Sequence, residues 1–226
     1  PRRMAGQTIT AIERRAKYLI FATANVSMLS HLGMTGTWRL APAGDERDHD
    51  HCYLHLVDGR RLAFRDPRRF GMLGMIEPGC NDAHPSLAGL GPEPLDQHGF
   101  NVETLAAACR GRKAPIKAVI MDQRIVVGVG NIYAAEALHR AGIRPTLAAG
   151  RLSRERLAKL VAAIREILRA AIQAGGSTIS DFRQAGGDSG YFQHHFLVYD
   201  RRGEACQTCA RPLVGRVVAG LSLIHI

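Results

Sequence analysis

Residues 126–133 (VVGVGNIY) contain the components of a phosphate-binding turn, with Gly128 and Gly130 just before Asn131, where a helix is expected to begin. The glycines let the backbone come close to a partner, and the first amides of a helix, together with its dipole, favour a phosphate. A dinucleotide-binding loop does not fit, because its sixth position should be glycine and is Tyr133 here. An ordinary glycine turn capped by Asn131 is the alternative.

Residues 65–71 (RDPRRFG) place Arg68 and Arg69 beside Phe70, on a loop that follows a strand-like run. A guanidinium can pair with an orphaned base or a phosphate, and an aromatic ring can wedge between the base steps of DNA. The alternative is a solvated basic turn with Phe70 in the core. Residues 14–18 (RRAKY) form a further basic cluster, which alone is typical of a solvated face.

A metal site is one interpretation of residues 48–51 (DHDH), where His49 and His51 would share one strand face with carboxylates beside them. Their spacing of two is less usual for zinc than the longer spacings found on helices, so contact of His49 with a phosphate is the better account.

Cys206 and Cys209 are spaced like the first half of a four-cysteine zinc ribbon. A second such pair is expected about fifteen to twenty residues later. The 17 residues that follow Cys209 contain no cysteine. Two thiolates alone would hold zinc weakly, so the sequence predicts an incomplete ribbon.

The composition favours a folded protein with a polyanionic partner. Among 226 residues, 46% are apolar, and 30 Lys and Arg against 20 Asp and Glu give a net charge of +10. Nucleic acid is the commonest partner for such an excess, although a merely basic soluble protein is the alternative. We find no apolar stretch long enough for a membrane span, no signal peptide in residues 1–4 and no disulfide framework. A cytosolic protein is expected.

The elements that must position these residues change in type along the chain. Roughly the first 75 residues favour strands, with apolar runs at 17–21 and 26–29 and a two-residue hairpin turn at Asp58-Gly59. The stretch 90–94 (LGPEP) suits a domain boundary. Helices are then expected near 115–122, over 131–140, and from a cap at Ser153 to Gly175-Gly176. An all-β front and an all-α back predict two domains.

These segments, in this order, resemble the formamidopyrimidine-DNA glycosylase family, which removes oxidised purines such as 8-oxoguanine from DNA. The resemblance covers about residues 7–218 and includes residues 31–36 (HLGMTG), 90–95 (LGPEPL) and 190–192 (GYF). The sequence of residues 128–131 (GVGN) favours this family over the related endonuclease VIII enzymes, which prefer oxidised pyrimidines.

The resemblance implies roles for particular side chains. Lys17 matches the active-site lysine that contacts the lesion's phosphate and assists proton transfer. Asn131 matches the phosphate contact at the second helix of a helix–two-turn–helix module. The other DNA-contacting positions are His49, Arg68 and Lys113. The side chains that fill the gap left by a flipped nucleotide are Met34, Arg68 and Phe70. The mobile lid over the flipped base includes Gly186, Gly187, Gly190 and Tyr191. An ordinary flexible connection is the alternative for the lid.

The implied fold is a multidomain α+β protein. It has an N-terminal β-sandwich catalytic domain over 1–92, a helix–two-turn–helix DNA-binding domain with the lid over 93–196, and an incomplete zinc-ribbon hairpin over 197–226. The family binds one zinc ion, for which Cys206 and Cys209 would be two of four ligands. The implied partner is damaged double-stranded DNA, bound by a monomer in the bacterial cytoplasm, in association with the nucleoid.

The family's nucleophile is an N-terminal proline followed by glutamate, whereas Arg2 and Arg3 follow Pro1 here. The motif positions place Pro1 inside the family's first domain, so we expect the nucleophile segment to be missing and Pro1 to have no catalytic role. Leu221 stands where the family has a DNA-binding arginine, and we expect a chain truncated at both ends.

The hypothesis for the complete protein is a bifunctional glycosylase and abasic-site lyase that acts by base flipping, Schiff-base formation and β,δ-elimination. The fragment itself is expected to be inactive. The alternatives are a catalytically dead DNA-binding remnant and an endonuclease VIII-like pyrimidine glycosylase.

Overall fold

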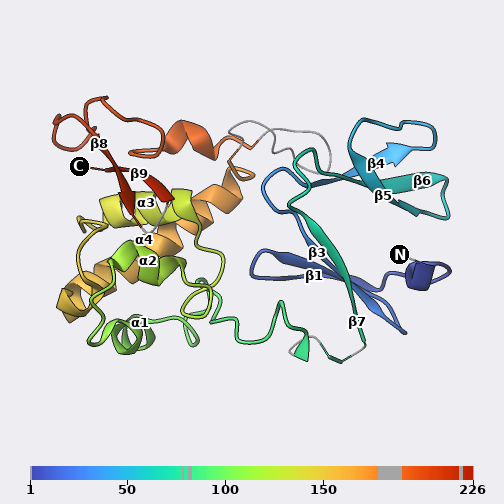
Figure 1. Cartoon of the computed structure of the whole chain (residues 1–226), viewed down its shortest axis with the longest axis horizontal. Helices are drawn as coiled ribbons and strands as arrows, with labels where there is room; N and C mark the ends of the chain where they lie inside the picture. Colours follow the sequence, from blue (N-terminus) through green and yellow to red (C-terminus); the bar gives the residue numbers. More distant parts are fainter. Residues whose placement is uncertain (1, 78, 81–82, 178–189, 219–220, 226) are drawn as a thin grey trace. The chain divides into compact units, whose positions relative to one another are not determined.

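The computed structural model describes residues 2–77, 79–80, 83–177, 190–218 and 221–225 (Figure 1). It divides into two compact units. The strand unit comprises Pro1–Ala88 and Ala174–Gln193, and the helical unit comprises Gly89–Gln173 and His194–Ile226.

The strand unit is a β-sandwich of two antiparallel sheets. One sheet has the order β1 (Ala11–Arg15), β2 (Tyr18–Ala22), β3 (Ser27–His31), β7 (Met72–Ile76), and the other has the order β4 (Thr37–Pro42), β6 (Arg60–Arg65), β5 (Asp50–His55). Both sheets contribute to one core, in which the ring centroids of Phe21 on β2 and Trp38 on β4 are 5.3 Å apart. The other buried members of this core are Met4, Val26, Met28 and Phe64.

The predicted hairpin joins β5 to β6, with Leu54 opposite Leu62. Its turn differs from the two-residue turn expected. Leu56 N–H donates to the Arg60 carbonyl at 2.8 Å, which leaves three residues, 57–59, in the loop. Only Gly59 has a positive φ in that loop, at 83°. A two-residue type I′ turn needs positive φ at both central residues, so Asp58 with its ordinary φ favours the longer loop.

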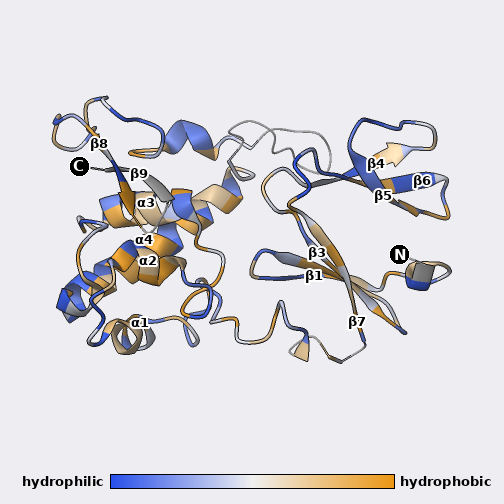
Figure 2. Ribbon diagram, in the orientation of Figure 1, coloured by the Kyte–Doolittle hydropathy of each residue, from blue (hydrophilic) through white to orange (hydrophobic). Residues whose placement is uncertain are grey.

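The helical unit contains α1 (Val102–Cys109), α2 (Ile116–Met121), α3 (Asn131–Arg140) and α4 (Arg154–Gln173), with a short 3₁₀ turn at Ala149–Arg151. A further 3₁₀ turn at Phe192–His195 includes the last residues of the strand unit and the first of the returning helical unit. The three expected helices are confirmed as α2, α3 and α4. The sequence analysis missed α1, which a capping box between Asn101 and Thr104 begins. Most of α2 is hydrophobic, whereas α4 alternates hydrophobic and hydrophilic residues as a helix with one buried face does (Figure 2).

A hairpin of β8 (Val214–Val218) and β9 (Leu221–His225) also belongs to the helical unit. The preceding chain is fixed to α3 by the buried carboxylate of Glu136. This carboxylate accepts hydrogen bonds from the amides of Leu197, Val198 and Tyr199 at 2.8–3.0 Å. The carboxylate thus satisfies a run of backbone donors outside any helix or sheet.

In the part of the chain that the structure describes, we find no helix with the length and apolar character that a bilayer crossing needs.

Candidate nucleic-acid interface

Asp66 holds together two loops of the strand unit. Its carboxylate is almost fully buried and accepts hydrogen bonds from Thr35 Oγ1 at 2.5 Å and from the Gly71 amide at 2.6 Å. Burial alone would raise the pKa of Asp66, but these bonds and those from the amides of Arg68 and Arg69 outweigh it and hold the pKa below its usual value. The ionised carboxylate therefore fixes the path of residues 66–71.

The turn at residues 32–36 presses against the same loop. Gly33 has a φ of +62°, and a Cβ added there would lie 2.5 Å from the Phe70 carbonyl carbon. The Arg68 amide donates to Thr35 Oγ1 at 3.2 Å. No other residue type fits at Gly33 without moving the Phe70 backbone.

The three side chains expected to fill a gap in DNA project from this pair of loops. Met34 is 67% exposed and Phe70 is 57% exposed, while the guanidinium carbon of Arg68 lies 4.9 Å from the centroid of the Phe70 ring. Phe70 is therefore outside the core, contrary to the alternative interpretation of this loop. Exposed apolar side chains on a fixed backbone are typical of a surface that contacts a partner.

Lys17 lies in the turn between β1 and β2. Its side chain is exposed overall, yet its surroundings partly desolvate the ammonium group and lower its pKa. The pKa of His31 on β3 is lowered by burial first and then by the charge of Lys17. The two groups are thus close enough to interact. A lysine with a lowered pKa spends more time as the neutral amine that proton transfer requires.

His49 is exposed and adopts a positive φ of 71°, next to the loop that Asp66 organises. Its carbonyl accepts the Asp66 amide at 3.0 Å, and the neighbouring His51 Nε2 lies 2.9 Å from the Asp66 carbonyl oxygen. The described residues include no group of three His, Cys, Asp or Glu side chains that could hold a metal ion. The geometry therefore gives no support to a metal ion at residues 48–51.

The helical unit places Asn131 at the first position of α3, and Gly130 is the N-cap residue. The interpretation of Asn131 as the cap of a glycine turn is therefore wrong. Lys117 Nζ donates a hydrogen bond to Asn131 Oδ1 at 2.5 Å. Lys117 is only 1% exposed, and burial lowers its pKa to about 8.

Gln123 fixes the glycine turn before α3. Its side-chain carbonyl accepts the Gly128 amide at 2.8 Å, and its Nε2 donates to the Val129 carbonyl at 3.3 Å. The Gly128 amide is therefore not available for a phosphate. Lys113 is exposed in the loop between α1 and α2.

The sequence analysis missed Lys117 and Gln123. The one available signal was a lone lysine inside the apolar run IKAVIM.

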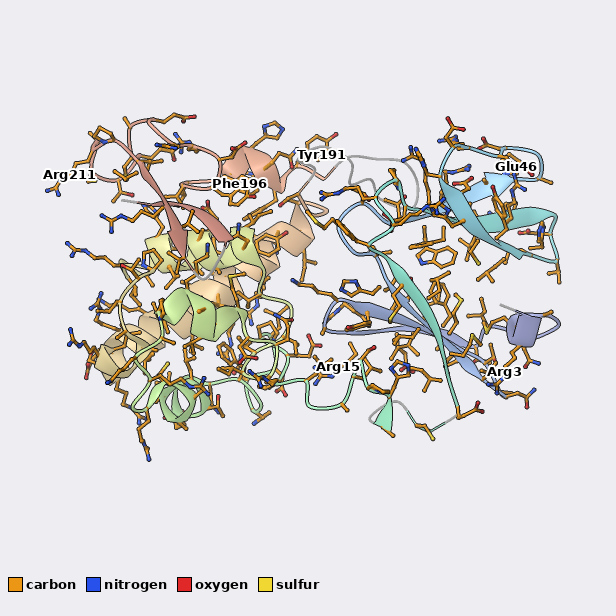
Figure 3. The ribbon with its side chains drawn as sticks, in the orientation of Figure 1. Arg3, Arg15, Glu46, Tyr191, Phe196 and Arg211 are labelled. Atoms are coloured by element: carbon orange, nitrogen blue, oxygen red, sulfur yellow. The ribbon has the colours of Figure 1, made fainter. Side chains whose placement is uncertain are left out.

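The expected lid falls largely outside the described residues, including Gly186 and Gly187. Gly190 packs against the carbonyl of Gly176 so closely that a side chain would collide with it. The Tyr191 amide donates to the Ala174 carbonyl at 2.9 Å, and the residue is 62% exposed. Its side chain is labelled in Figure 3.

Cys206 is buried and Cys209 is exposed. Cys206 Sγ lies 3.5 Å from His139 Nε2. Burial would raise the pKa of Cys206, but hydrogen bonds from His139, from the amides of Thr208 and Cys209 and from the Cys209 side chain lower it to about 6. A structural zinc ion takes four ligands, and no group of three is present in the described part of the chain. Cys206 and Cys209 therefore do not form a complete zinc site with the other described residues.

Two family models match the chain. The formamidopyrimidine-DNA glycosylase N-terminal domain matches residues 1–73, and the H2TH domain of the same enzyme matches residues 90–183. Formamidopyrimidine-DNA glycosylase from Bdellovibrio bacteriovorus is 55% identical over 96% of this chain and 79% of its own length. The enzyme from Stenotrophomonas maltophilia is 51% identical over 93% of this chain and 77% of its own length.

Solved structures match as well. The MutM (Fpg) protein of Thermus thermophilus is 42% identical, with a TM-score of 0.89 over 98% of this chain and 82% of that protein. The Lactococcus lactis Fpg protein in complex with abasic-site DNA is 32% identical, with a TM-score of 0.92 over 99% of this chain and 82% of that protein. A relative as similar as the Bdellovibrio enzyme, matched over most of its length, shows that this chain belongs to the formamidopyrimidine-DNA glycosylase family.

Proposed function

We propose that the protein removes oxidised purines, such as 8-oxoguanine and formamidopyrimidines, from duplex DNA and then cleaves the abasic site. The observation that carries this proposal is the pair of loops that Asp66 and Gly33 hold together, with Met34, Arg68 and Phe70 exposed on them. An enzyme that flips a nucleotide out must fill the gap with rigidly held apolar and cationic groups. Solved complexes of Lactococcus lactis Fpg proteins contain Fapy-dG and abasic-site DNA, which supports the same substrate class.

The proposed reaction has two stages. A secondary amine forms a bond to the sugar C1′ while the bond from C1′ to the base breaks, and the base leaves with the electron pair and takes up a proton. The bond from C1′ to the ring oxygen O4′ then breaks to give the Schiff base, which acidifies the C2′ proton. Loss of that proton breaks the bond from C3′ to its oxygen, and a second elimination breaks the bond at C5′. Pro1 lies outside the described residues, and we assign it no role.

Lys17 is the residue proposed to move protons in these steps. Partial desolvation lowers the pKa of its ammonium group. The same lysine contributes to the lowered pKa of His31, after burial. Because both pKa values are lowered, a larger fraction of each group is in the neutral form, which is the form that can accept a proton.

The helical unit is proposed to grip the duplex independently of sequence. Asn131, held by Lys117, would contact one backbone phosphate at the start of α3, and Lys113 would contact another. His49 and Arg68 would add contacts from the strand unit. This grip should weaken steeply with salt, because each neutralised phosphate releases counterions.

The remaining parts of the proposal follow the family. The domains are a β-sandwich over 1–92, a helix–two-turn–helix domain over 93–196 and a ribbon hairpin over 197–226, and the protein is a cytoplasmic, nucleoid-associated monomer. The lid is the loop 186–192. In the family, a zinc ion would strengthen the ribbon; Cys206 and Cys209 are the ligands this chain could offer, and no catalytic step here depends on the ion.

Borohydride trapping on duplexes that carry 8-oxoguanine tests the proposal. Reduction of a Schiff base gives a covalent protein–DNA adduct, which is expected of the protein that carries the family's Pro-Glu nucleophile. An adduct of the 226-residue chain itself would exclude the catalytically dead remnant. Tight binding without any adduct would instead establish the catalytically dead DNA-binding remnant. A parallel panel of oxidised pyrimidines decides the substrate class, because preferential processing of those bases would identify an endonuclease VIII-like enzyme.

A further inference from the structure

A strongly cationic pocket lies in the helical unit, where the loop between α1 and α2 meets the segment between α3 and α4. It has a volume of about 660 Å³, and Arg112, Lys113, Arg144 and Arg151 all contribute to its lining. The lining includes no carboxylate. Four like charges around one hollow repel one another, so the arrangement favours an anion between them.

Backbone hydrogen bonds fix the two walls of this pocket against each other. The Gly150 amide donates to the Arg112 carbonyl at 3.0 Å, and the Ala149 amide donates to the Ala114 carbonyl at 2.9 Å. Pro115 and Ala148 form an antiparallel bridge beside them. A Cβ added to Gly150 would lie 3.1 Å from the Arg112 backbone nitrogen, which shows how closely the walls approach. The four cationic residues are therefore held by two segments whose backbones are bonded to each other, rather than by independent loops.

Two exposed arginines elsewhere in the same unit have carboxylate partners. Arg140 pairs with Glu166, and Arg154 pairs with Glu103. Within the described ranges, none of the four pocket cations forms an ion pair with a carboxylate.

Asp122 is the acidic group that Arg112 influences. The pKa of Asp122 is lowered first by its hydrogen bonds to Arg124 and least by the charge of Arg112. The Asp122 carboxylate is already paired with Arg124 at 2.8 Å, so Asp122 does not neutralise the positive charge of the pocket.

Lys117 connects the pocket wall to Asn131. Its amide donates to the Pro145 carbonyl, between the lining residues Arg144 and Thr146, at 3.3 Å. Its Nζ donates to Asn131 Oδ1 at 2.5 Å. Lys117 thus bonds both the segment that carries Arg144 and Thr146 and the first residue of α3.

We propose that this pocket binds a phosphate group and that, in the complex with DNA, the group is a backbone phosphate of the duplex. The inference rests on the proposed function for the identity of the partner. The family resemblance supplies only Lys113; Arg112, Arg144 and Arg151 come from the geometry of the pocket.

The test compares three double variants of the full chain by titration against an undamaged duplex at several salt concentrations. R144A/R151A removes two pocket charges. R140A/R154A removes the same charge from arginines that have carboxylate partners. R144K/R151K retains the pocket charge. The slope of log binding constant against log salt should become shallower by about one for R144A/R151A, since each phosphate contact contributes about 0.9. The other two variants should keep the parental slope.

Inorganic phosphate distinguishes the source of the ligand. It should shift the amide NMR signals of Gly111 and Gly150 in the parent and not in R144A/R151A. If phosphate shifts these signals but the salt slope is unchanged, the DNA assignment is overturned and the pocket serves a free phosphate compound. If neither measurement responds, the pocket proposal fails altogether. Failure of the proposed function is seen separately, as an absence of borohydride adduct with the protein that carries the Pro-Glu nucleophile.

Discussion

Lys117 Nζ donates a hydrogen bond to Asn131 Oδ1 at 2.5 Å, so a buried lysine on α2 orients the side chain that begins α3. Burial lowers the pKa of this lysine to about 8. Burying this cationic donor costs stability, because its charge is poorly solvated. Its hydrogen-bond acceptor is Asn131, the residue proposed to contact DNA.

Lys117→Met should weaken binding to abasic-site DNA while it preserves the fold. Methionine fills a similar volume but cannot donate the hydrogen bond to Asn131 Oδ1, and the loss of one such bond costs about 1–3 kcal/mol. We therefore expect an affinity roughly 5- to 150-fold lower by fluorescence anisotropy. Lys159→Met, at an exposed position on α4, is the matched control. Equal affinity of both variants would show that Lys117 does not position Asn131.

Stability should rise with pH because of Lys117. Below about pH 8 the lysine is protonated in both the folded and unfolded states, so the full cost of burying the charge is present. Between about pH 8 and the unfolded pKa of 10.5, the folded state releases its proton while the unfolded state keeps it. The unfolded state then binds more protons, and the free energy of unfolding increases with pH.

Urea unfolding of the parent and of Lys117→Met, from about pH 7 to pH 10, measures this effect. The difference between the two proteins should change in favour of the parent by about 2–3 kcal/mol over that range. A constant difference would mean that Lys117 has an ordinary pKa.

Phe70→Ala should reduce the preference for damaged DNA without reducing stability. The ring is 57% exposed, so its removal should change the free energy of unfolding by less than about 0.5 kcal/mol. The ratio of affinities for abasic-site and undamaged duplexes should fall at least several-fold, because the ring can fill a gap only where a base is missing. Val57→Ala, on the exposed β5–β6 loop, should leave the ratio unchanged. A ratio that survives Phe70→Ala would remove the ring from the proposed interface.

Helices and strands with a strong hydrophobic period could be predicted from the sequence. Features that depend on tertiary contacts could not. The apolar spacing of α4 and the β5–β6 pairing are local patterns, and both were found. Helix α1 has only eight residues, with consecutive alanines that carry little amphipathic signal. Whether Phe70 is buried could not be decided from spacing, since its exposure depends on the contact between Gly33 and its backbone.

The same limit applies to the candidate site. The family motifs supplied Lys17, Arg68 and Asn131, but the residues that hold them are polar groups distant in sequence. Asp66 meets Thr35 across 31 positions, and Lys117 meets Asn131 across 14. Neither pair follows a helical or strand period, so no local pattern predicts it.

Glu136→Ala should be strongly destabilising, because this buried carboxylate accepts three backbone hydrogen bonds from residues 197–199. Alanine retains the helix propensity of α3 but leaves those amides without their acceptor, which is expected to cost about 3–5 kcal/mol in urea unfolding. Glu136→Gln keeps one acceptor oxygen and should lose less. Glu166→Ala, which removes an exposed carboxylate paired with Arg140, should cost under about 1 kcal/mol. If Glu136→Ala cost no more than Glu166→Ala, other contacts would hold the segment that leads to the β8–β9 hairpin, since of these two carboxylates the one that accepts the three backbone hydrogen bonds is that of Glu136.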